Sequence, residues 1–204
     1  MPAEPIVKEY DIDIDLYRVT KDIGFNSHGC RNLAMNETKS DWNMLMDIDW
    51  TIDTDTIKKI DSFIRNGNPE KQKVYTFIHS IDDKEAINVF LIHKETFWKA
   101  RGYDEELVNI HTGDDLFYES LRDSGAILSP TSWKVTSLRK GRSIIFSETD
   151  IVYDTDITVY DDKNMLLYQP GTSNHWNEMR ERVSQRNKSK GLKPTLTFSW
   201  EKII

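Results

Sequence analysis

One short run of apolar residues places the strongest limit on how this chain can fold. Residues 42–48 read Trp-Asn-Met-Leu-Met-Asp-Ile, and the run ends in two carboxylates, Asp47 and Asp49, with one residue between them. Such a run predicts a strand that is buried on both faces, as in a parallel sheet. Side chains two positions apart on a strand point to the same side, so we expect both carboxylates at one site where the strand ends.

Strand-like and helix-like segments alternate along the rest of the chain. Strands are predicted at 12–20, 73–80, 87–94 and 195–200, with a hairpin at 156–170. Helices are predicted at 3–10, 30–40, 54–67 and 113–125, and a basic helix or loop at 175–191. This alternation favours an α/β fold with a mainly parallel central sheet. A chain of 204 residues suits one domain, residues 1–204.

Composition excludes several classes of protein. The formal net charge of −7 disfavours a general nucleic-acid binder. The single cysteine, Cys30, excludes an internal disulfide and suits a reducing compartment. The first residues, MPAEPIVKEYDIDID, carry acids where a secretory signal needs an apolar run, and no stretch approaches the length of a membrane span. We therefore expect a cytoplasmic protein with no transmembrane segment.

The Asp-x-Asp pair with the following Thr51 is compatible with two kinds of enzyme. It resembles the nucleophile motif of haloacid-dehalogenase-like phosphatases, in which Asp47 would attack phosphorus and Asp49 would protonate the leaving group, with Mg²⁺ on the phosphoryl oxygens. The other parts of such a site would come from Ser80, Lys94 or Lys99, and the acidic stretch 113–119. That family opens with this strand, whereas 46 residues precede Asp47 here.

Two separated signatures instead resemble those of family 2-like glycosyltransferases with the GT-A fold. The first runs from "DIGFNSHGCRNLAM" to "SDWNMLMDIDW", where these enzymes have Ala-Arg-Asn before an apolar strand that ends in Asp-x-Asp. The second, "RGYDEELVNIHTGDD", resembles their Gly-Gly-Tyr-Asp-Glu and Gly-Glu-Asp, with Arg101 in place of the first Gly and Asp114 in place of the Glu. The resemblance covers roughly residues 22–125 and implies a three-layer, Rossmann-like GT-A fold.

The resemblance implies a metal-dependent, inverting enzyme that moves a sugar from a UDP-sugar, such as UDP-glucose or UDP-galactose, to a hydroxyl of a glycan or another acceptor. Mn²⁺ or Mg²⁺, which suit carboxylate ligands, would be held by Asp49 and Asp47 with His175, and His111 is a rival ligand. The cation would stabilise the diphosphate as its charge grows during C–O cleavage. Arg31, Asp47 and Asp49 would contact the nucleotide or its diphosphate.

The same resemblance assigns the second acidic site to catalysis. Asp115 matches the Asp of Gly-Glu-Asp, which takes the proton of the acceptor hydroxyl as general base, and Asp114 would bind acceptor hydroxyls. Their place at a helix N-terminus favours the ionised form. Within the C-terminal part, residues 150–204, a basic lid would close over the diphosphate, and its basic residues are Arg180, Arg182, Arg186, Lys188, Lys190 and Lys193.

These families begin with a strand–helix–strand unit that binds the uracil base. Only about 11 residues precede the first predicted strand here. We therefore expect an N-terminally truncated or minimal GT-A domain with weak selectivity for the base. A third hypothesis is a catalytically inactive relic that binds a nucleotide sugar or a glycan.

Overall fold

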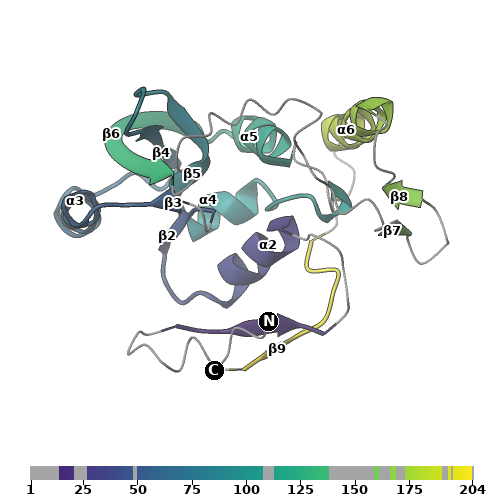
Figure 1. The fold of residues 1–204 in the computed structure, drawn as a ribbon, viewed down its shortest axis with the longest axis horizontal. Helices are drawn as coiled ribbons and strands as arrows, with labels where there is room; N and C mark the ends of the chain where they lie inside the picture. Colours follow the sequence, from purple (N-terminus) through teal and green to yellow (C-terminus); the bar gives the residue numbers. More distant parts are fainter. Residues whose placement is uncertain are drawn as a thin grey trace.

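The computed structural model describes residues 14–20, 27–47, 50–107, 113–137, 159–160, 166–168, 173–189, 193 and 195–203. These residues form one five-stranded sheet, two small two-stranded sheets and the helices around them (Figure 1). The fold is mixed α/β, which confirms the class predicted from the sequence. The helix predicted at 3–10 lies outside the described residues.

The five-stranded sheet is mixed rather than mainly parallel, so that prediction is wrong. Its order is β2 (Trp42–Leu45), β5 (Glu85–His93), β4 (Lys73–His79), β6 (Ile127–Ser137) and β3 (Trp50–Thr51). Only the β4–β6 pair is parallel, and the other three pairs are antiparallel. The physical reason is the short turn at residues 80–84 between β4 and β5, since a parallel crossover needs about a dozen residues or more.

Strand β2 lies at one edge of this sheet, which corrects the prediction of a strand buried on both faces. Leu45 is buried, whereas the Met44 side chain is 39% exposed. The strand ends at Leu45, so Asp47 does lie just beyond a strand end, as predicted. The chain then enters β3, which pairs with β6 at the opposite edge of the sheet.

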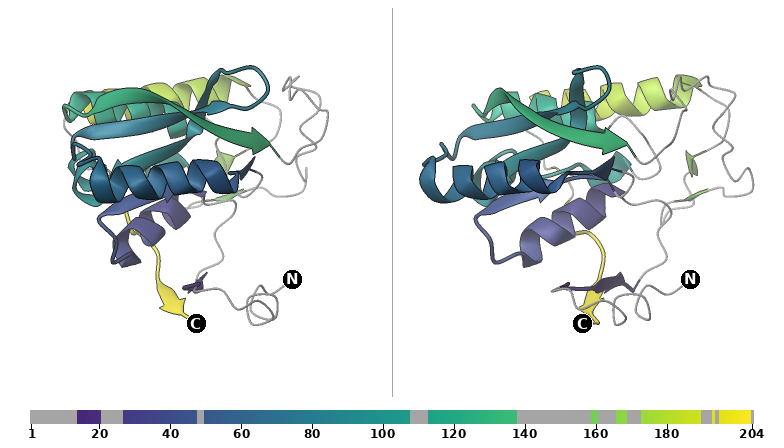
Figure 2. Two further views of the ribbon diagram at one scale, coloured as in Figure 1. Left: turned by 90° about the vertical axis from the view of Figure 1, so that its left-hand side faces the viewer. Right: turned by 60° about the vertical axis from the view of Figure 1, so that its left-hand side comes forward.

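Apolar side chains on both faces of the sheet divide the domain into three layers. Successive residues of β5 alternate between two clusters, with Phe90 and Ile92 in one and Val89 and Leu91 in the other. The first cluster includes residues of α2 (Ser27–Glu37), α4 (Lys94–Lys99) and α5 (Gly113–Asp123), and the second includes residues of α3 (Thr54–Asn66). Figure 2 shows α3 on one side of the sheet and the other helices behind it. Helices therefore lie on both faces of the sheet.

Local signals explain why the helices begin and end where they do. Asp53 caps α3, because its carboxylate accepts from the backbone N–H of Thr56 at 2.7 Å, and Gly67 follows the last turn. Gly125 has a φ of +83° just after α5, a conformation that glycine adopts without strain. Both helices match the ranges predicted from the sequence.

Two short pairs of strands and helix α6 make up the rest of the described elements. β1 (Tyr17–Val19) pairs with β9 (Trp200–Lys202), and β7 (Val159–Tyr160) pairs with β8 (Leu166–Tyr168), both antiparallel. Helix α6 (Ser173–Lys188) packs Met179 and Val183 against Leu116 of α5 and Leu107 of η1 (Glu105–Leu107). No helix in the described part of the chain is long and apolar enough to cross a membrane.

Candidate active site

Arg31 of α2 lies between two carboxylates that are far apart in the sequence. Its guanidinium forms ion pairs with Asp47, beyond β2, and with Asp114, in the first turn of α5. The Arg31 Nη1 to Asp114 Oδ1 distance is 2.5 Å, and the Arg31 side chain is only 12% exposed. Three of the predicted site residues are therefore joined directly.

Two further residues, which have no predicted role, join these three. Tyr103 is fully buried; its hydroxyl accepts from Arg31 Nη1 at 2.8 Å and donates to Asp114 Oδ1 at 3.0 Å. Asn88 of β5 donates to the second carboxylate oxygen of Asp47. We call these five residues, Arg31, Asp47, Asn88, Tyr103 and Asp114, the Arg31 cluster.

One signal in the sequence could have found Asn88. It is a polar residue inside the otherwise apolar strand β5. The antiparallel ladder pairs Leu45 with Phe90, and two more steps in the same register put Asp47 opposite Asn88. A polar residue facing a strand-end carboxylate is the kind of pair that holds the carboxylate in place.

Burial and charge fix the protonation of the central groups. Burial alone would lower the pKa of the Arg31 guanidinium, but Tyr103, Asp114 and Asp47 outweigh this and raise that pKa above its usual range. Burial raises the pKa of the Tyr103 hydroxyl well above its ordinary value, and the Asp114 carboxylate raises it further. Arg31 therefore stays charged and Tyr103 keeps its proton at neutral pH. The Arg31 cluster holds one fixed cation between two carboxylates.

The turn that carries Tyr103 is held by Asn32, the neighbour of Arg31 on α2. Asn32 Oδ1 accepts from the backbone N–H of Tyr103 at 2.8 Å, and Asn32 Nδ2 donates to Glu105 Oε1 at 2.8 Å. Gly102 has a φ of +61°, and a Cβ there would lie 2.6 Å from Asn32 Oδ1. Glycine is thus required where α2 and this turn meet.

Gly113, the first residue of α5, lets His28 of α2 pack directly against the start of that helix. A Cβ on Gly113 would lie 1.8 Å from His28 Nε2, and His28 is only 3% exposed, so its ring has little room to move. We expect Gly113→Ala to lower the free energy of unfolding by about 1–3 kcal/mol, measured by urea denaturation. The same change in a His28→Ala background should cost much less. An equal loss in both backgrounds would show that the His28 contact is not the cause.

Asp115 has different neighbours from Asp114, although the two residues are adjacent. Its side chain is 51% exposed and lies 3.7 Å from the guanidinium of Arg180 on α6. Asp115 lines a pocket of about 240 Å³, together with Glu85, Tyr118, Glu119, Arg122, Leu128 and Arg180. The hydroxyl of Tyr118 is buried and makes no hydrogen bond with any described residue. Asp114 therefore belongs to the Arg31 cluster, and Asp115 faces the pocket of about 240 Å³.

Asp47 is the one predicted metal ligand whose side chain the structure describes. Asp49 and His111 lie outside the described residues, and α6 includes His175 without a described side chain. Within the described residues, no group of three or more His, Cys, Asp or Glu side chains could hold a metal ion. The half-exposed carboxylate of Asp47 offers hard oxygen ligands that fit Mn²⁺ or Mg²⁺. A complete donor set would need Asp49 and His175 as well.

The basic residues of α6 contact α5 and η1 in the part of the helix that is described. Arg186 forms ion pairs with the buried Asp104 and with Glu106, and Arg182 Nη2 lies 3.0 Å from Glu106 Oε1. Lys190 lies outside the described residues. These contacts attach α6 to the domain, and closure of this segment over a diphosphate stays a prediction.

Comparisons with known proteins give similarities to solved structures only, and two of these are as follows. No protein-family model and no curated protein matches the chain. The catalytic domain of Drosophila β1,4-galactosyltransferase 7 in complex with xylobiose is similar with a TM-score of 0.43 and 16% identity, over 55% of this chain and 48% of that one. A mutant of the Drosophila enzyme in complex with manganese, UDP-Gal and xylobiose is similar with a TM-score of 0.45 and 15% identity, over 77% of this chain and 66% of that one. The chain thus spans less than two thirds of either structure, and similarities this low carry no information about its activity.

Proposed function

We propose that this chain is a metal-dependent glycosyltransferase that moves a sugar from a UDP-sugar to an acceptor hydroxyl with inversion. The proposal is supported above all by the meeting of the two sequence signatures in one cluster. Arg31 and Asp47 come from the first signature, Tyr103 and Asp114 come from the second, and Arg31 and Asp114 are 83 residues apart in the sequence. Unrelated motifs have no reason to meet in a shared network of hydrogen bonds.

The donor diphosphate is proposed to bind beside Asp47. Asp47 and Asp49, with His175, would hold Mn²⁺ or Mg²⁺, and the bound cation would stabilise the leaving diphosphate. Each carboxylate oxygen has two lone pairs, so Asp47 can keep its bonds to Arg31 and Asn88 and still offer ligands to a cation. Arg31 orients Asp47 and adds positive charge beside the diphosphate.

The acceptor is proposed to bind in the pocket that Asp115 lines. An acceptor hydroxyl there would meet the half-exposed Asp115 carboxylate, which would accept its proton as the oxygen attacks the anomeric carbon. Tyr118 lines the same pocket, and its hydroxyl makes no hydrogen bond with the described residues. Asp114, held by Arg31 and Tyr103, would bind a further acceptor hydroxyl with its remaining lone pairs.

The phosphatase hypothesis has less support from the same contacts. In that hypothesis Lys94 or Lys99 would balance the charge beside Asp47, and Thr51 belongs to the nucleophile motif. The ammonium of Lys94 donates to the carbonyl groups at the end of α2 and just after it, at 3.0 and 2.7 Å. The hydroxyl of Thr51 donates to a backbone carbonyl of β6 at 3.2 Å. These contacts engage Lys94 and Thr51 away from Asp47.

Nucleotide release by the full chain tests the proposal. With Mn²⁺ and a panel of nucleotide sugars, we expect release of UDP that stops when EDTA is added and is lost in Asp49→Ala. Asp55→Ala, which removes an exposed carboxylate from α3, is the matched control and should retain release.

The other two hypotheses give different results in the same assay. Hydrolysis of a generic phosphate ester, or a phosphoryl group trapped on Asp47, would replace the transferase proposal with the phosphatase. Binding of UDP and metal without turnover would replace it with the inactive relic.

A further inference from the structure

A second, larger pocket lies apart from both parts of the proposed active site. Its volume is about 560 Å³, and its described lining comes from the C-terminal parts of α4, α5 and α6 and from four residues beyond them, Ala100, Arg101, Ser124 and Lys193. None of its described lining residues belongs to the Arg31 cluster or to the pocket of Asp115. Ser120, which lines it, is six residues after Asp114, or about 9 Å further along α5.

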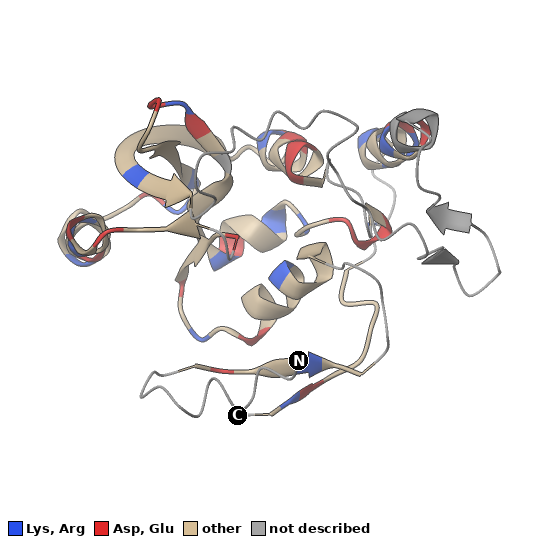
Figure 3. Cartoon of the chain, viewed as in Figure 1, with Lys and Arg blue, Asp and Glu red and all other residues tan. Residues whose placement is uncertain are grey.

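This pocket carries a concentration of positive charge. Its lining includes four basic side chains, Lys99, Arg101, Lys188 and Lys193, and one carboxylate, Asp123. Basic residues lie on both α4 and α6 (Figure 3). The chain as a whole has a formal charge of −7, so the sign of this pocket is opposite to that of the protein. A cavity lined by charges of one sign raises the local concentration of ions of the other sign.

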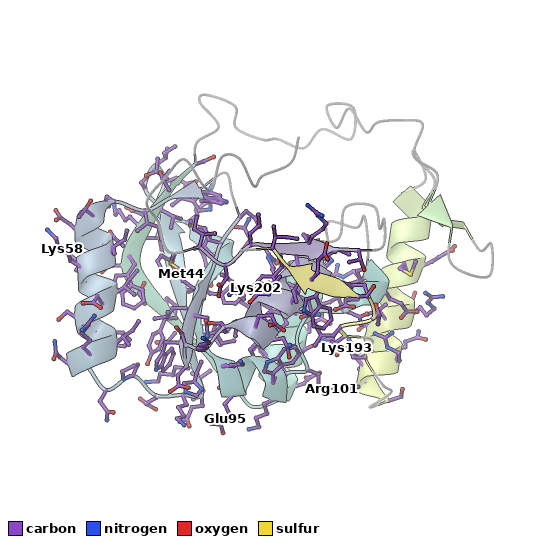
Figure 4. All side chains as sticks on the ribbon, turned by 90° about the horizontal axis from the view of Figure 1, so that it is seen from below. Met44, Lys58, Glu95, Arg101, Lys193 and Lys202 are labelled. Carbon is purple, nitrogen blue, oxygen red and sulfur yellow. The ribbon has the colours of Figure 1, made fainter. Side chains whose placement is uncertain are left out.

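Lys193 gives the second indication that an anion belongs here. The side chain is only 8% exposed, and its ammonium donates to the Gly102 carbonyl at 2.6 Å and to Ser120 Oγ at 3.1 Å. All of its hydrogen-bond partners in the described residues are neutral, whereas buried charged groups are normally paired with an opposite charge. Burial, with the nearby cations Arg101 and Arg186, lowers the pKa of Lys193 to about 7, so at neutral pH this group is fully charged only when an anion lies beside it. Figure 4 shows Arg101 and Lys193 close together beside α6.

We propose that this pocket binds a tetrahedral oxyanion, a phosphate or sulfate group carried by a small molecule. Arg101 would donate charge-assisted hydrogen bonds to its oxygens, Lys193 would add positive charge from within the lining, and the exposed Lys99 and Lys188 would attract it at the rim. The hydroxyl of Ser120 is a further polar group within the lining. The volume lies in the range of about 300–1,000 Å³ found for small-molecule sites, so there is room for more than a free ion.

A pair of charge-matched variants tests this site without touching its buried residues. Lys99→Gln with Lys188→Gln removes the two exposed cations at the rim. Lys58→Gln with Lys59→Gln removes two exposed cations from α3, which lies far from Lys193 (Figure 4). Binding of sodium sulfate and sodium phosphate to the full chain is measured by calorimetry, with chloride keeping the ionic strength constant because salt screens exposed charges. We expect saturable binding to the wild type and the α3 variant, and a dissociation constant at least tenfold higher for the rim variant.

Any of three results would overturn the proposal. The wild type shows no saturable binding of sulfate or phosphate, both double variants lose the same affinity, or the rim variant loses none. Glucose 6-phosphate and glucose 6-sulfate are then compared with glucose. Tighter binding of either ester than of glucose supports the site, and the ester that binds more tightly shows whether phosphate or sulfate is preferred. Glucose that binds as tightly as the esters would overturn it. The measurement needs no turnover, so its outcome is separate from that of the glycosyltransferase proposal.

Discussion

Replacing Asp115 with Asn is expected to lower kcat for sugar transfer by about 10²–10⁴-fold, with little change in KM for the donor. Asn keeps the size of the side chain and removes the group that accepts the proton. Asp115 is half-exposed and outside the Arg31 cluster, so the fold should not change. The measurement is the steady-state rate of nucleotide release at saturating donor, with urea denaturation to check stability.

Variants of two other carboxylates of α5 test whether the loss of kcat is specific to Asp115. Glu119 also lies 3.7 Å from Arg180 and lines the same pocket, so Glu119→Gln should raise KM for the acceptor and leave kcat within a few-fold. A larger loss of kcat in Asp114→Asn than in Asp115→Asn, with the fold intact, would move the general base to Asp114. Wild-type kcat in Asp115→Asn would remove Asp115 from the chemistry altogether.

Replacing Arg31 with Gln is expected to lower the free energy of unfolding by about 2–4 kcal/mol, because two carboxylates lose the cation between them. The side chains of Arg31, Asp47 and Asp114 are 12%, 38% and 20% exposed, so water can only partly replace the lost ion pairs. Urea denaturation of the purified variants gives this free energy.

A double variant separates the loss of charge pairing from a general loss of packing. Arg31→Gln combined with Asp114→Asn should recover at least half of the stability lost in Arg31→Gln alone. Arg18→Gln is the control, since Arg18 and Glu201 form an ion pair with side chains 53% and 51% exposed, and we expect it to cost under about 1 kcal/mol. A loss in Arg31→Gln no larger than that in Arg18→Gln would contradict the role given to Arg31.

The parts of the fold that depend on local signals were predictable from the sequence. Helices α3 and α5 each have acidic residues at the start and an apolar face, and a glycine follows shortly after the last helical residue. The pairing of strands is not local, and the mixed character of the sheet therefore could not be predicted. Strand β6, the longest one described, is not predictable from its pattern, because Pro130 interrupts it. The register with β4 shifts near this point, and the Thr131 hydroxyl donates to the Thr76 carbonyl at 2.7 Å, close to where proline has no N–H to offer.

The charged residues of the candidate site can be predicted from the sequence, but which neighbours each of them contacts cannot. Arg31, Asp47 and Asp114 were singled out from the sequence, and they are joined in one cluster. The separation of Asp114 from Asp115 could not be predicted, because adjacent residues on a helix differ by about 100° in direction and only the neighbours decide what each one meets. The roles of Asp49 and His175 stay predictions.

The two edges of the five-stranded sheet are joined by a very short connection. Strand β2 ends at Leu45 on one edge and β3 begins at Trp50 on the other, so four residues link them, and the Trp50 N–H bonds to the Asp47 carbonyl at 3.3 Å. The edges of a flat five-stranded sheet would be about 19 Å apart, farther than the roughly 16–18 Å that five fully extended Cα–Cα steps cover. A connection that contains a turn cannot span that distance, so the sheet must curl, as β6 does in Figure 1. The short link between Leu45 and Trp50 is therefore compatible only with a curled sheet, and a residue inserted into this link would relax the curl.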